Sequence, residues 1–559
     1  MADEYDFASS LAPQGTDFQF DSRQFVYIPD QNNGSYPNSQ VTFDLAGLSN
    51  SGKWISWKDS NLVIPLVLNV NCSAGAFATA NAENNFCASL KNSVFQLISS
   101  MSVELTNNSI VNLTNFSNLD INYRLLNRIS SEEMENLAPS ILFSKDSAES
   151  ITYTSAASAQ GIGECNNTIA QTVFSPTGGW GTTSYLQNKG RADRMKYTSF
   201  DATQRANFTT NALAGTVGKN YNTVSTTNNT FYITATLPMR FLHDVFDKLP
   251  LMRGAYYRLI LNLNAQSQAI MTLASTGTTY STLSVSSPNN QLPFMLSPLG
   301  AGSGFVAAGT ATQVTASLGI SKSLVPAGTF SHPTINQCRI YACCYTMTPL
   351  YEERYLSMVP TKTVRYNDIL SFQQLAVSPG ANVNWLVTNG VSRARNLVVY
   401  PFISGTINGS NPLLNASTFT AGIAAGSPLN SPFSSAPATC APFHNFSNFN
   451  VLLSGSALYQ SNYQYKFETF LQENRPSMGL NGGNSLGLSS GIIGQSDFEN
   501  GYGFAYVDLS RKISPASDDV SRSVQLLFTN NSAFQVDYIA IISYEREITV
   551  STSTGSLVI

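Results

Sequence analysis

An internal repeat constrains the fold of this chain more than any other feature. Gln337 opens the run QCRIYACCYT and Gln535 opens QVDYIAIISY, with Gln, Ala and the apolar alternation in the same places. Earlier in each half, Asn61 opens NLVIPL and Asn396 opens NLVVYPF, two apolar runs that each reach a proline. Period-two alternation indicates half-buried strands. Because the two motifs follow in the same order in both halves, the repeat predicts two similar β units in tandem.

The two units differ in length, and one segment joins them. The Asn motifs lie 335 residues apart and the Gln motifs 198 residues apart, so the first unit carries 137 more residues between its motifs. In the joining segment, residues 337–370, we expect the strand through Ala342 to close the first unit. Residues 351–358 then cross to the second unit, which residues 363–370 begin.

Short strand patterns recur along the chain, and long helical patterns are almost absent. The helical patterns cover residues 123–129, a segment opened by a capping box of Ser130 and Glu133, and residues 239–249 before Pro250. Runs between Gly- and Pro-rich turns are typical of an all-β sandwich or barrel. They predict strands at residues 24–29, 40–45, 62–70, 93–113, 231–238, 255–264, 363–375, 383–387, 396–402, 459–471, 504–509, 523–529 and 535–550.

A chain of 559 residues is too long for one hydrophobic core. An eight-stranded jelly roll with elaborated loops uses about 150 to 200 residues, so two fit this length. We therefore predict an all-β fold of two tandem eight-stranded jelly rolls, a double jelly roll, with short helices and long loop excursions at 144–229 and 405–442. The predicted parts are an N-terminal arm (1–22), a first jelly roll with large insertions (23–350), a linker (351–362), a second jelly roll (363–550) and a C-terminal tail (551–559).

The surface of the chain is poor in charge. Only 11% of the residues are Asp, Glu, Lys or Arg, against about 25% in an ordinary soluble domain. Such a surface is easily buried against a neighbour, because desolvating charged groups is costly. The composition fits extensive self-association and a secreted or cell-surface β protein equally well. The net charge of -4 and the acidic opening MADEYD argue against sequence-specific nucleic-acid binding.

The apolar runs and cysteines bear on the compartment. The opening lacks a signal-peptide pattern, and the longest apolar run, residues 62–70, is interrupted by Pro65 and Asn69, so we expect no transmembrane anchor. The cysteines are odd in number and lack metal-type spacing, which favours buried thiols in a reducing compartment. The seven cysteines are Cys72, Cys87, Cys165, Cys338, Cys343, Cys344 and Cys440.

No pattern carries catalytic or cofactor chemistry. Ser489 lies in a G-x-S-x-G match, but no helical pattern follows it as a hydrolase nucleophile requires. His243 and Asp244 lie on an expected helix among apolar residues, where a local capping role is the better interpretation. Residues 215–219, GTVGK, fall short of a phosphate-binding loop. We predict no enzyme, no cofactor, and no catalytic, cofactor-binding or metal site.

A basic cluster, Lys189, Arg191, Arg194 and Lys196, admits two interpretations. It is suited to contact packaged nucleic acid or an acidic partner. Asp193 interrupts it and few aromatic residues are interleaved, which favours a solvated loop.

Three stretches carry a resemblance to a known family. They are LPMRFLHDVFDKLPLMRGAYYRLILNLN, YLSMVPTKTVRYNDILSF, and ENRPSMGLNGGNSLGLSSGIIGQSDFENGYGFAYVDLSRK with FTNNSAFQVDYIAIISYERE. The chain resembles major capsid proteins of the double jelly-roll lineage, most closely those of polinton-like viruses, virophages and adintoviruses. The excursions at 144–229 and 405–442 match nothing in the family, and the family has no catalytic residues to transfer.

The resemblance implies a viral major capsid protein located in the virion. Such a chain forms a pseudo-hexagonal homotrimeric capsomer that tiles an icosahedral shell around a DNA genome. Its partners would be neighbouring capsomers, a penton protein and minor or cement proteins, and the arm and tail would reach adjacent subunits. The alternative is a secreted or surface β-sandwich adhesin that binds glycans, favoured by the Ser, Thr and Asn content and by aromatic residues such as Trp180.

Overall fold

The computed structural model describes most of the two predicted units. The residues that it describes are 19–49, 51–74, 88–136, 138–146, 149–153, 165–171, 190, 194, 223–224, 228–273, 280–296, 313–321, 332, 335–404, 429, 446–474, 491–500, 502–532 and 535–557.

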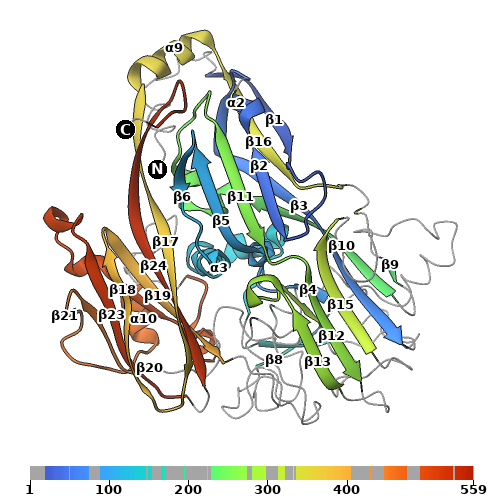
Figure 1. Cartoon of the computed structure of the whole chain (residues 1–559), viewed down its shortest axis with the longest axis vertical. Coiled ribbons are helices and arrows are strands. Elements are labelled where there is room, and N and C mark those ends of the chain that lie inside the picture. The colour runs from blue at the N-terminus through green and yellow to red at the C-terminus, as the bar shows by residue number, and fades with distance from the viewer. Residues whose placement is uncertain are drawn as a thin grey trace.

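Eight strands of the first half form two sheets (Figure 1). In chain order they are β1 Phe20–Pro29, β2 Gln40–Asp44, β3 Trp54–Ala74, β5 Ile98–Leu105, β6 Asn108–Val111, β10 Asn228–Pro238, β11 Tyr257–Leu263 and β16 Arg339–Met347. One sheet has the order β1-β16-β3-β10 and the other β2-β11-β5-β6. When the eight strands are lettered B to I along the chain, these orders are B-I-D-G and C-H-E-F, the arrangement of a jelly roll.

The second half repeats this arrangement, with no further strand among its described residues. Its strands are β17 Thr361–Val377, β18 Asn382–Val391, β19 Ala394–Ile403, β20 Phe446–Leu453, β21 Ser456–Ala457, β22 Ala505–Asp508, β23 Arg522–Asn530 and β24 Val536–Ser551. The sheets β17-β24-β19-β22 and β18-β23-β20-β21 are again B-I-D-G and C-H-E-F. The predicted double jelly roll is therefore confirmed by strand order.

The repeated motifs lie on equivalent strands. The Gln motifs form the two I strands, β16 and β24, and the Asn motifs lie on the two D strands, β3 and β19. The pairing registers are not identical. In the first half, Asn61 pairs with Tyr341, and the repeat makes Ile539 the equivalent of Tyr341. In the second half, however, Asn396 pairs with Ser543, which is four residues beyond Ile539.

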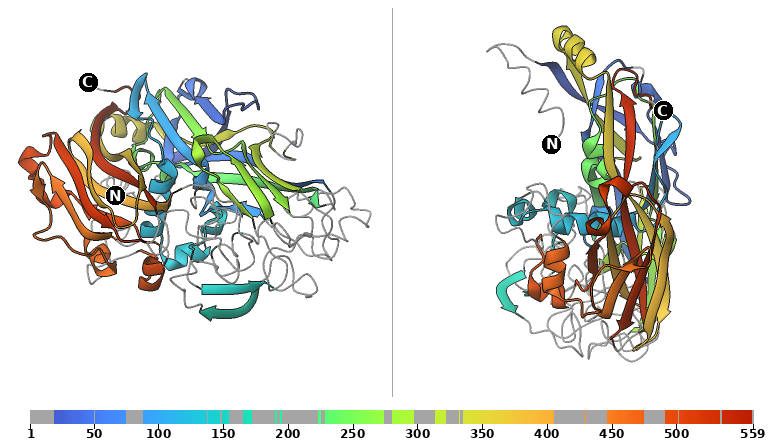
Figure 2. Two further views of the ribbon diagram at one scale, coloured as in Figure 1. Left: turned by 60° about the horizontal axis from the view of Figure 1, so that its bottom comes forward. Right: turned by 90° about the vertical axis from the view of Figure 1, so that its left-hand side faces the viewer.

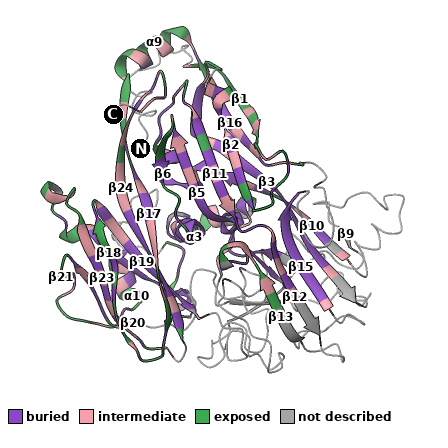
Figure 3. Cartoon of the chain, viewed as in Figure 1, coloured by how far each residue is buried: buried purple, intermediate pink, exposed green. Residues whose placement is uncertain are grey.

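Alternation along the strands produces the cores. In β11 every second residue, from Tyr257 to Leu263, is buried, and the residues between them are exposed or half-buried. Ala342 of β16 and Ala540 of β24 are both fully buried. Figure 3 shows buried residues along the strands of both jelly rolls and exposed ones on β1 and at the ends of the molecule.

The extra length of the first half lies in two insertions. Between β11 and β16, strands β12 Ser267–Leu273, β13 Tyr280–Ser286, β14 Phe294–Leu296 and β15 Gln313–Ile320 add to the fold. β15 pairs with the C-terminal part of β3, so this insertion lengthens the B-I-D-G sheet. Between β6 and β10 lie helices α3 Ser117–Arg128 and α4 Ser131–Asn136, the 3-10 turn η2 Ala138–Ile141 and strands β7 Glu149–Tyr153, β8 Cys165–Gln171 and β9 Thr223–Val224. The predicted capping box is confirmed, because Ser130 and Glu133 exchange hydrogen bonds.

Short elements complete the chain. Strand β4 Ala88–Leu90 pairs with β14 in a separate two-stranded sheet. The remaining helices and 3-10 turns are α2 Ala46–Ser49, η1 Val94–Leu97, α7 Met239–Leu242, α8 Asp244–Lys248, η4 Pro288–Asn290, α9 Pro349–Met358, α10 Phe467–Glu473, α11 Gln495–Asn500, η6 Ser510–Lys512 and η7 Pro515–Ser517. α9 connects the last strand of the first jelly roll to the first strand of the second at one end of the molecule (Figure 1).

The structure differs from the expectations in several places. The single strand expected over residues 93–113 is the 3-10 turn η1 followed by the antiparallel pair of β5 and β6, and β20 was not predicted. Residues 459–471 are not a strand. The side chains of Tyr459, Tyr463 and Tyr465 pack together in an aromatic cluster, and helix α10 follows. The helix expected over 239–249 is two helices, since His243 is extended and caps the second. Residues 551–557 of the tail pack on their own chain, where Thr552 is buried.

Candidate functional site at the junction of the two jelly rolls

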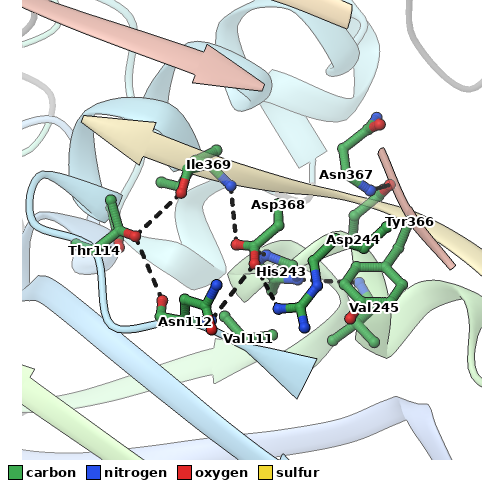
Figure 4. A network of polar contacts seen from close by, with 12 residues as sticks. Val111, Asn112, Thr114, His243, Asp244, Val245, Tyr366, Asn367, Asp368 and Ile369 are labelled. Atoms are coloured by element: carbon green, nitrogen blue, oxygen red, sulfur yellow. Dashed lines mark hydrogen bonds and ion pairs between the residues drawn. The ribbon is translucent and has the colours of Figure 1, made fainter. Parts of the chain in front are cut away.

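A buried carboxylate, Asp368 on β17, lies where the two jelly rolls meet (Figure 4). Its Oδ2 is 3.1 Å from Nη1 of Arg546 and accepts a hydrogen bond of 3.2 Å from the Tyr544 hydroxyl, both on β24. The backbone N–H of Asn112, just after β6, also points at this oxygen, at 3.5 Å. Asp368 therefore joins two strands of the second jelly roll to the end of a strand of the first.

His243 approaches Asp368 from the first jelly roll. Its Nδ1 accepts a hydrogen bond from the backbone N–H of Val245, which confirms the predicted capping role. Since Nδ1 is an acceptor, the proton of a neutral ring is assigned to Nε2. Nε2 lies 3.5 Å from Asp368 Oδ1, longer than an ordinary hydrogen bond. The next residue, Asp244, accepts a 3.2 Å hydrogen bond from the backbone N–H of Asn367.

The pKa of Asp368 lies below its ordinary value of 3.8. Burial by itself would raise this pKa, because it penalises the charged form. Interactions with His243, the backbone N–H of Ile369 and the guanidinium of Arg546 outweigh burial and hold the pKa down. The carboxylate is therefore ionised at neutral pH and binds its partners in that form.

The end of β6 is held from the second jelly roll. Arg546 donates from Nη1 to the carbonyl of Ile110 and from Nη2 to the carbonyl of Ser109, each at 3.0 Å. The buried Tyr366 hydroxyl also donates to the carbonyl of Ile110. Ile110 is buried, so these contacts give its carbonyl hydrogen-bond partners, whereas Ser109 is exposed.

Helix α3 of the first jelly roll covers the outer face of the second B-I-D-G sheet. The ring of Tyr123 stacks on Tyr506 with centroids 5.8 Å apart and meets Phe504 edge to face at 5.3 Å. Its hydroxyl donates to Asn474 Oδ1 at 2.6 Å, and Asn474 Nδ2 donates to Asn127 Oδ1 at 2.7 Å. Aromatic packing and a buried amide network thus fix α3 on this sheet.

A glycine of the second jelly roll lies against the C-terminal turn of α3. Gly491 has φ +65, and a Cβ there would lie 2.2 Å from the carbonyl oxygen of Leu126. The next residue, Ile492, donates its backbone N–H to that same oxygen at 3.0 Å. Gly491 is the last residue of the G-x-S-x-G match. Its positive φ and its close approach to α3 explain why a glycine is needed at this position.

A polar cavity of about 290 Å³ remains beside α3 and α8. Its charged side chains are largely paired: Arg124 with Asp120 at 2.8 Å, and Lys248 with Asp244 at 2.8 Å. Within the described residues, no group of three or more His, Cys, Asp or Glu side chains is placed to bind a metal ion. The geometry at this junction is suited to holding two jelly rolls at a fixed angle. The cavity is lined by Asp120, Tyr123, Arg124, Asn127, His243, Asp244, Lys248, Asn367, Ile369, Arg395, Asn396, Tyr506, Asp508, Ser510, Ser543 and Glu545.

The basic cluster has one described side chain. Arg194 is buried and forms a 2.6 Å ion pair with Asp146, so the solvated-loop interpretation is wrong for this residue. Lys189, Arg191 and Lys196 lie outside the described residues. So do Ser489, Trp180 and residues 215–219.

Sequence patterns single out His243 and Asp244 but not Asp368, Tyr544 or Arg546. The signal that points to a junction residue is an ionisable residue inside an otherwise apolar or uncharged strand pattern. Asp368, followed by Ile369 and Leu370 in RYNDILSF, is such a residue, whereas Arg546 lies between Glu545 and Glu547 and gives no such signal. Among the described residues, no helix is both long enough and apolar enough to cross a membrane.

Comparisons with known proteins gave structural similarities alone. No family model matches the chain, and no curated protein matches it. A chain in the cryo-EM structure of the Sputnik virophage is similar with a TM-score of 0.47 and 12% identity, over 98% of this chain and 89% of that one. The mavirus major capsid protein is similar with a TM-score of 0.44 and 11% identity, over 98% and 93%. The Faustovirus major capsid protein is similar with a TM-score of 0.43 and 10% identity, over 96% and 92%. The fold assignment rests on the strand order of the chain itself.

Proposed function

We propose that this chain is a viral major capsid protein that assembles as a homotrimer. The observation that carries the proposal is the presence of two complete B-I-D-G and C-H-E-F jelly rolls in one chain. Three such chains supply six similar barrels, which approximate a sixfold outline with threefold symmetry. A subunit of this shape tiles a shell of hexagonal units.

The junction supports this proposal because a tiling subunit needs a fixed angle between its barrels. The buried Asp368 contacts, the α3 docking and the close approach at Gly491 each join the two jelly rolls. The charge-poor composition also favours large contacts between subunits, since few charges need desolvation.

We further propose the predicted division of the chain, the virion location and the partners as parts of the same function. The parts are an arm (1–22), jelly rolls at 23–350 and 363–550 with a linker at 351–362, and a tail (551–559). The partners are neighbouring capsomers, a penton protein and minor or cement proteins, with a DNA genome inside the shell and no enzymatic role. The described cysteines Cys338, Cys343 and Cys344 are free and buried, which fits synthesis in a reducing compartment.

The mass of the purified full chain in solution tests the proposal. Sedimentation velocity at micromolar concentration should give a single species near three times the chain mass of 60.4 kDa. A persistent monomer contradicts the capsomer. A monomer that also binds immobilised glycans favours the adhesin alternative instead.

A further inference from the structure

An exposed aromatic surface lies on the first B-I-D-G sheet. Of the nine large hydrophobic side chains that are exposed in the described chain, three lie on β1: Phe20, Phe25 and Tyr27. Phe25 is 52% exposed and Tyr27 is 50% exposed. Strand β1 is the edge of its sheet and is largely exposed along its length (Figure 3). We call the set Phe20, Arg23, Phe25, Tyr27, Arg339, Tyr341 and Tyr345, from β1 and β16, the aromatic face.

Two arginines lie within the aromatic face. The Arg23 guanidinium is 5.4 Å from the ring centroid of Phe25, and the Arg339 guanidinium is 4.9 Å from that of Tyr27. Neither arginine forms an ion pair with the part of the chain that the structure describes. Arg23 Nε donates a hydrogen bond of 3.2 Å to the sulfur of Cys343. Aromatic residues and Arg are the types that are enriched in protein interfaces, because they bury large areas and retain directional contacts.

The second jelly roll shows what covers the equivalent face. The outer side of its B-I-D-G sheet lies under α3 and α8 of the first jelly roll, through Tyr123 on Tyr506 and through Asp244 on Asn367. α3 is part of the segment between strands F and G of the first jelly roll. The corresponding segment of the second jelly roll carries α10 and α11, and Figure 2 shows these helices on the same side of the sheets as α3.

Helices α10 and α11 carry exposed acidic residues, opposite in charge to the two arginines of the aromatic face. A cavity of about 530 Å³ lies between them, with Phe467 and Phe498 among its lining residues. Glu468 and Glu499 also line it and are exposed, and neither forms an ion pair within the described residues; Lys466 lines it as well. The exposed charges around this cavity are therefore mainly acidic, opposite in sign to the arginines of the aromatic face, while Phe467 is half-buried and Phe498 is buried.

We propose that the aromatic face of one copy packs against the α10–α11 surface of a second copy of this chain. Within one copy, α3 covers the outer face of the second B-I-D-G sheet. In the proposed contact, α10 and α11 of another copy cover the outer face of the first B-I-D-G sheet in the same way. Because the two surfaces differ, the contact is heterologous, and three repeats close a ring. This inference rests on the proposed function, since it names the surfaces that form the trimer.

Two double variants test the contact. Phe25→Asp with Tyr27→Asp alters the aromatic face, and Glu468→Lys with Glu499→Lys alters the helical surface. Each variant alone should sediment as a monomer at a concentration where the unaltered chain is a trimer. An equimolar mixture should give a dimer and no trimer, because the intact aromatic face of one variant meets the intact helical surface of the other.

A matched control and a crosslink complete the experiment. Leu386→Asp with Val520→Asp changes two other exposed apolar residues and should leave the trimer intact. A photoreactive phenylalanine at position 27 of the otherwise unaltered chain should crosslink to peptides within residues 464–503 of another copy.

The outcomes separate this inference from the proposed function. Trimers that persist in both double variants, or crosslinks that avoid residues 464–503, overturn the inference and leave the trimer standing. A monomeric unaltered chain overturns both. Dimers from the mixture and monomers from each variant support both.

Discussion

At the scale of single residues, Asp368 shows how the junction is held. Its side chain is fully buried and receives contacts from β24, from the end of β6 and from His243. A buried charge is costly unless each of its oxygens has partners. Replacing Asp368 with an uncharged residue leaves the Arg546 guanidinium without its carboxylate partner. The loss of folding stability is therefore large, even if the intact ion pair itself contributes little net stability.

We predict that Asp368→Asn lowers the free energy of unfolding by about 3 kcal/mol. Urea unfolding followed by fluorescence measures the change. Asp519→Asn is the matched control, because Asp519 pairs with Arg393 at the surface with 78% of its side chain exposed. The control should change stability by about 0.5 kcal/mol or less. Equal losses in the two variants would show that the junction contact is not a stabilising one.

The lowered pKa of Asp368 also predicts a pH dependence. A carboxyl whose pKa is depressed by folding contributes stability above its ordinary pKa, and this is lost as the pH falls through the folded value. The unaltered chain should therefore lose stability below about pH 4. The loss should be smaller in Asp368→Asn, measured by urea unfolding at several pH values between neutral and acidic. Parallel curves for the two proteins would contradict the assignment.

At the scale of elements, the sequence is informative where burial alternates and uninformative where distant segments meet. The Gln motifs follow from period-two alternation and the Asn motifs from continuous apolar runs, but β20 has no counterpart among the predicted strands. The predicted strand at 459–471 fails because its aromatic residues pack into a local cluster, which alternation alone does not distinguish from a sheet. The junction contacts join residues more than a hundred positions apart, such as Asp368 and Asn112, and no local pattern specifies such a pairing.

The close approach at Gly491 gives an element-scale prediction. Gly491→Ala should destabilise the chain by about 3 kcal/mol, because its Cβ meets the backbone of α3 and cannot be accommodated by a side-chain shift. Gly380→Ala is the control, since Gly380 also has positive φ but nothing lies within 4 Å of its Cβ position. The control should cost about 1 kcal/mol. Thermal unfolding compares the two variants. Similar unfolding midpoints would contradict the close packing of Gly491 against α3.

At the scale of the whole molecule, two jelly rolls with the same strand order are joined in one chain. Equivalent strands recur in both halves, and the long insertions of the first half leave its strand order intact. The contact between the halves within one chain uses the outer face of the second B-I-D-G sheet. The equivalent strands β1 and β16 of the first sheet carry the aromatic face, in which Phe20, Phe25 and Tyr27 are exposed in the described part of the chain.

Images of the purified particle test the central claim most directly. Electron microscopy of the full chain should show class averages with threefold symmetry and a nearly hexagonal outline, built from six barrel densities of two alternating kinds. Particles with only two barrel densities, or oligomers with twofold symmetry, would contradict the assignment of this chain as a capsomer subunit.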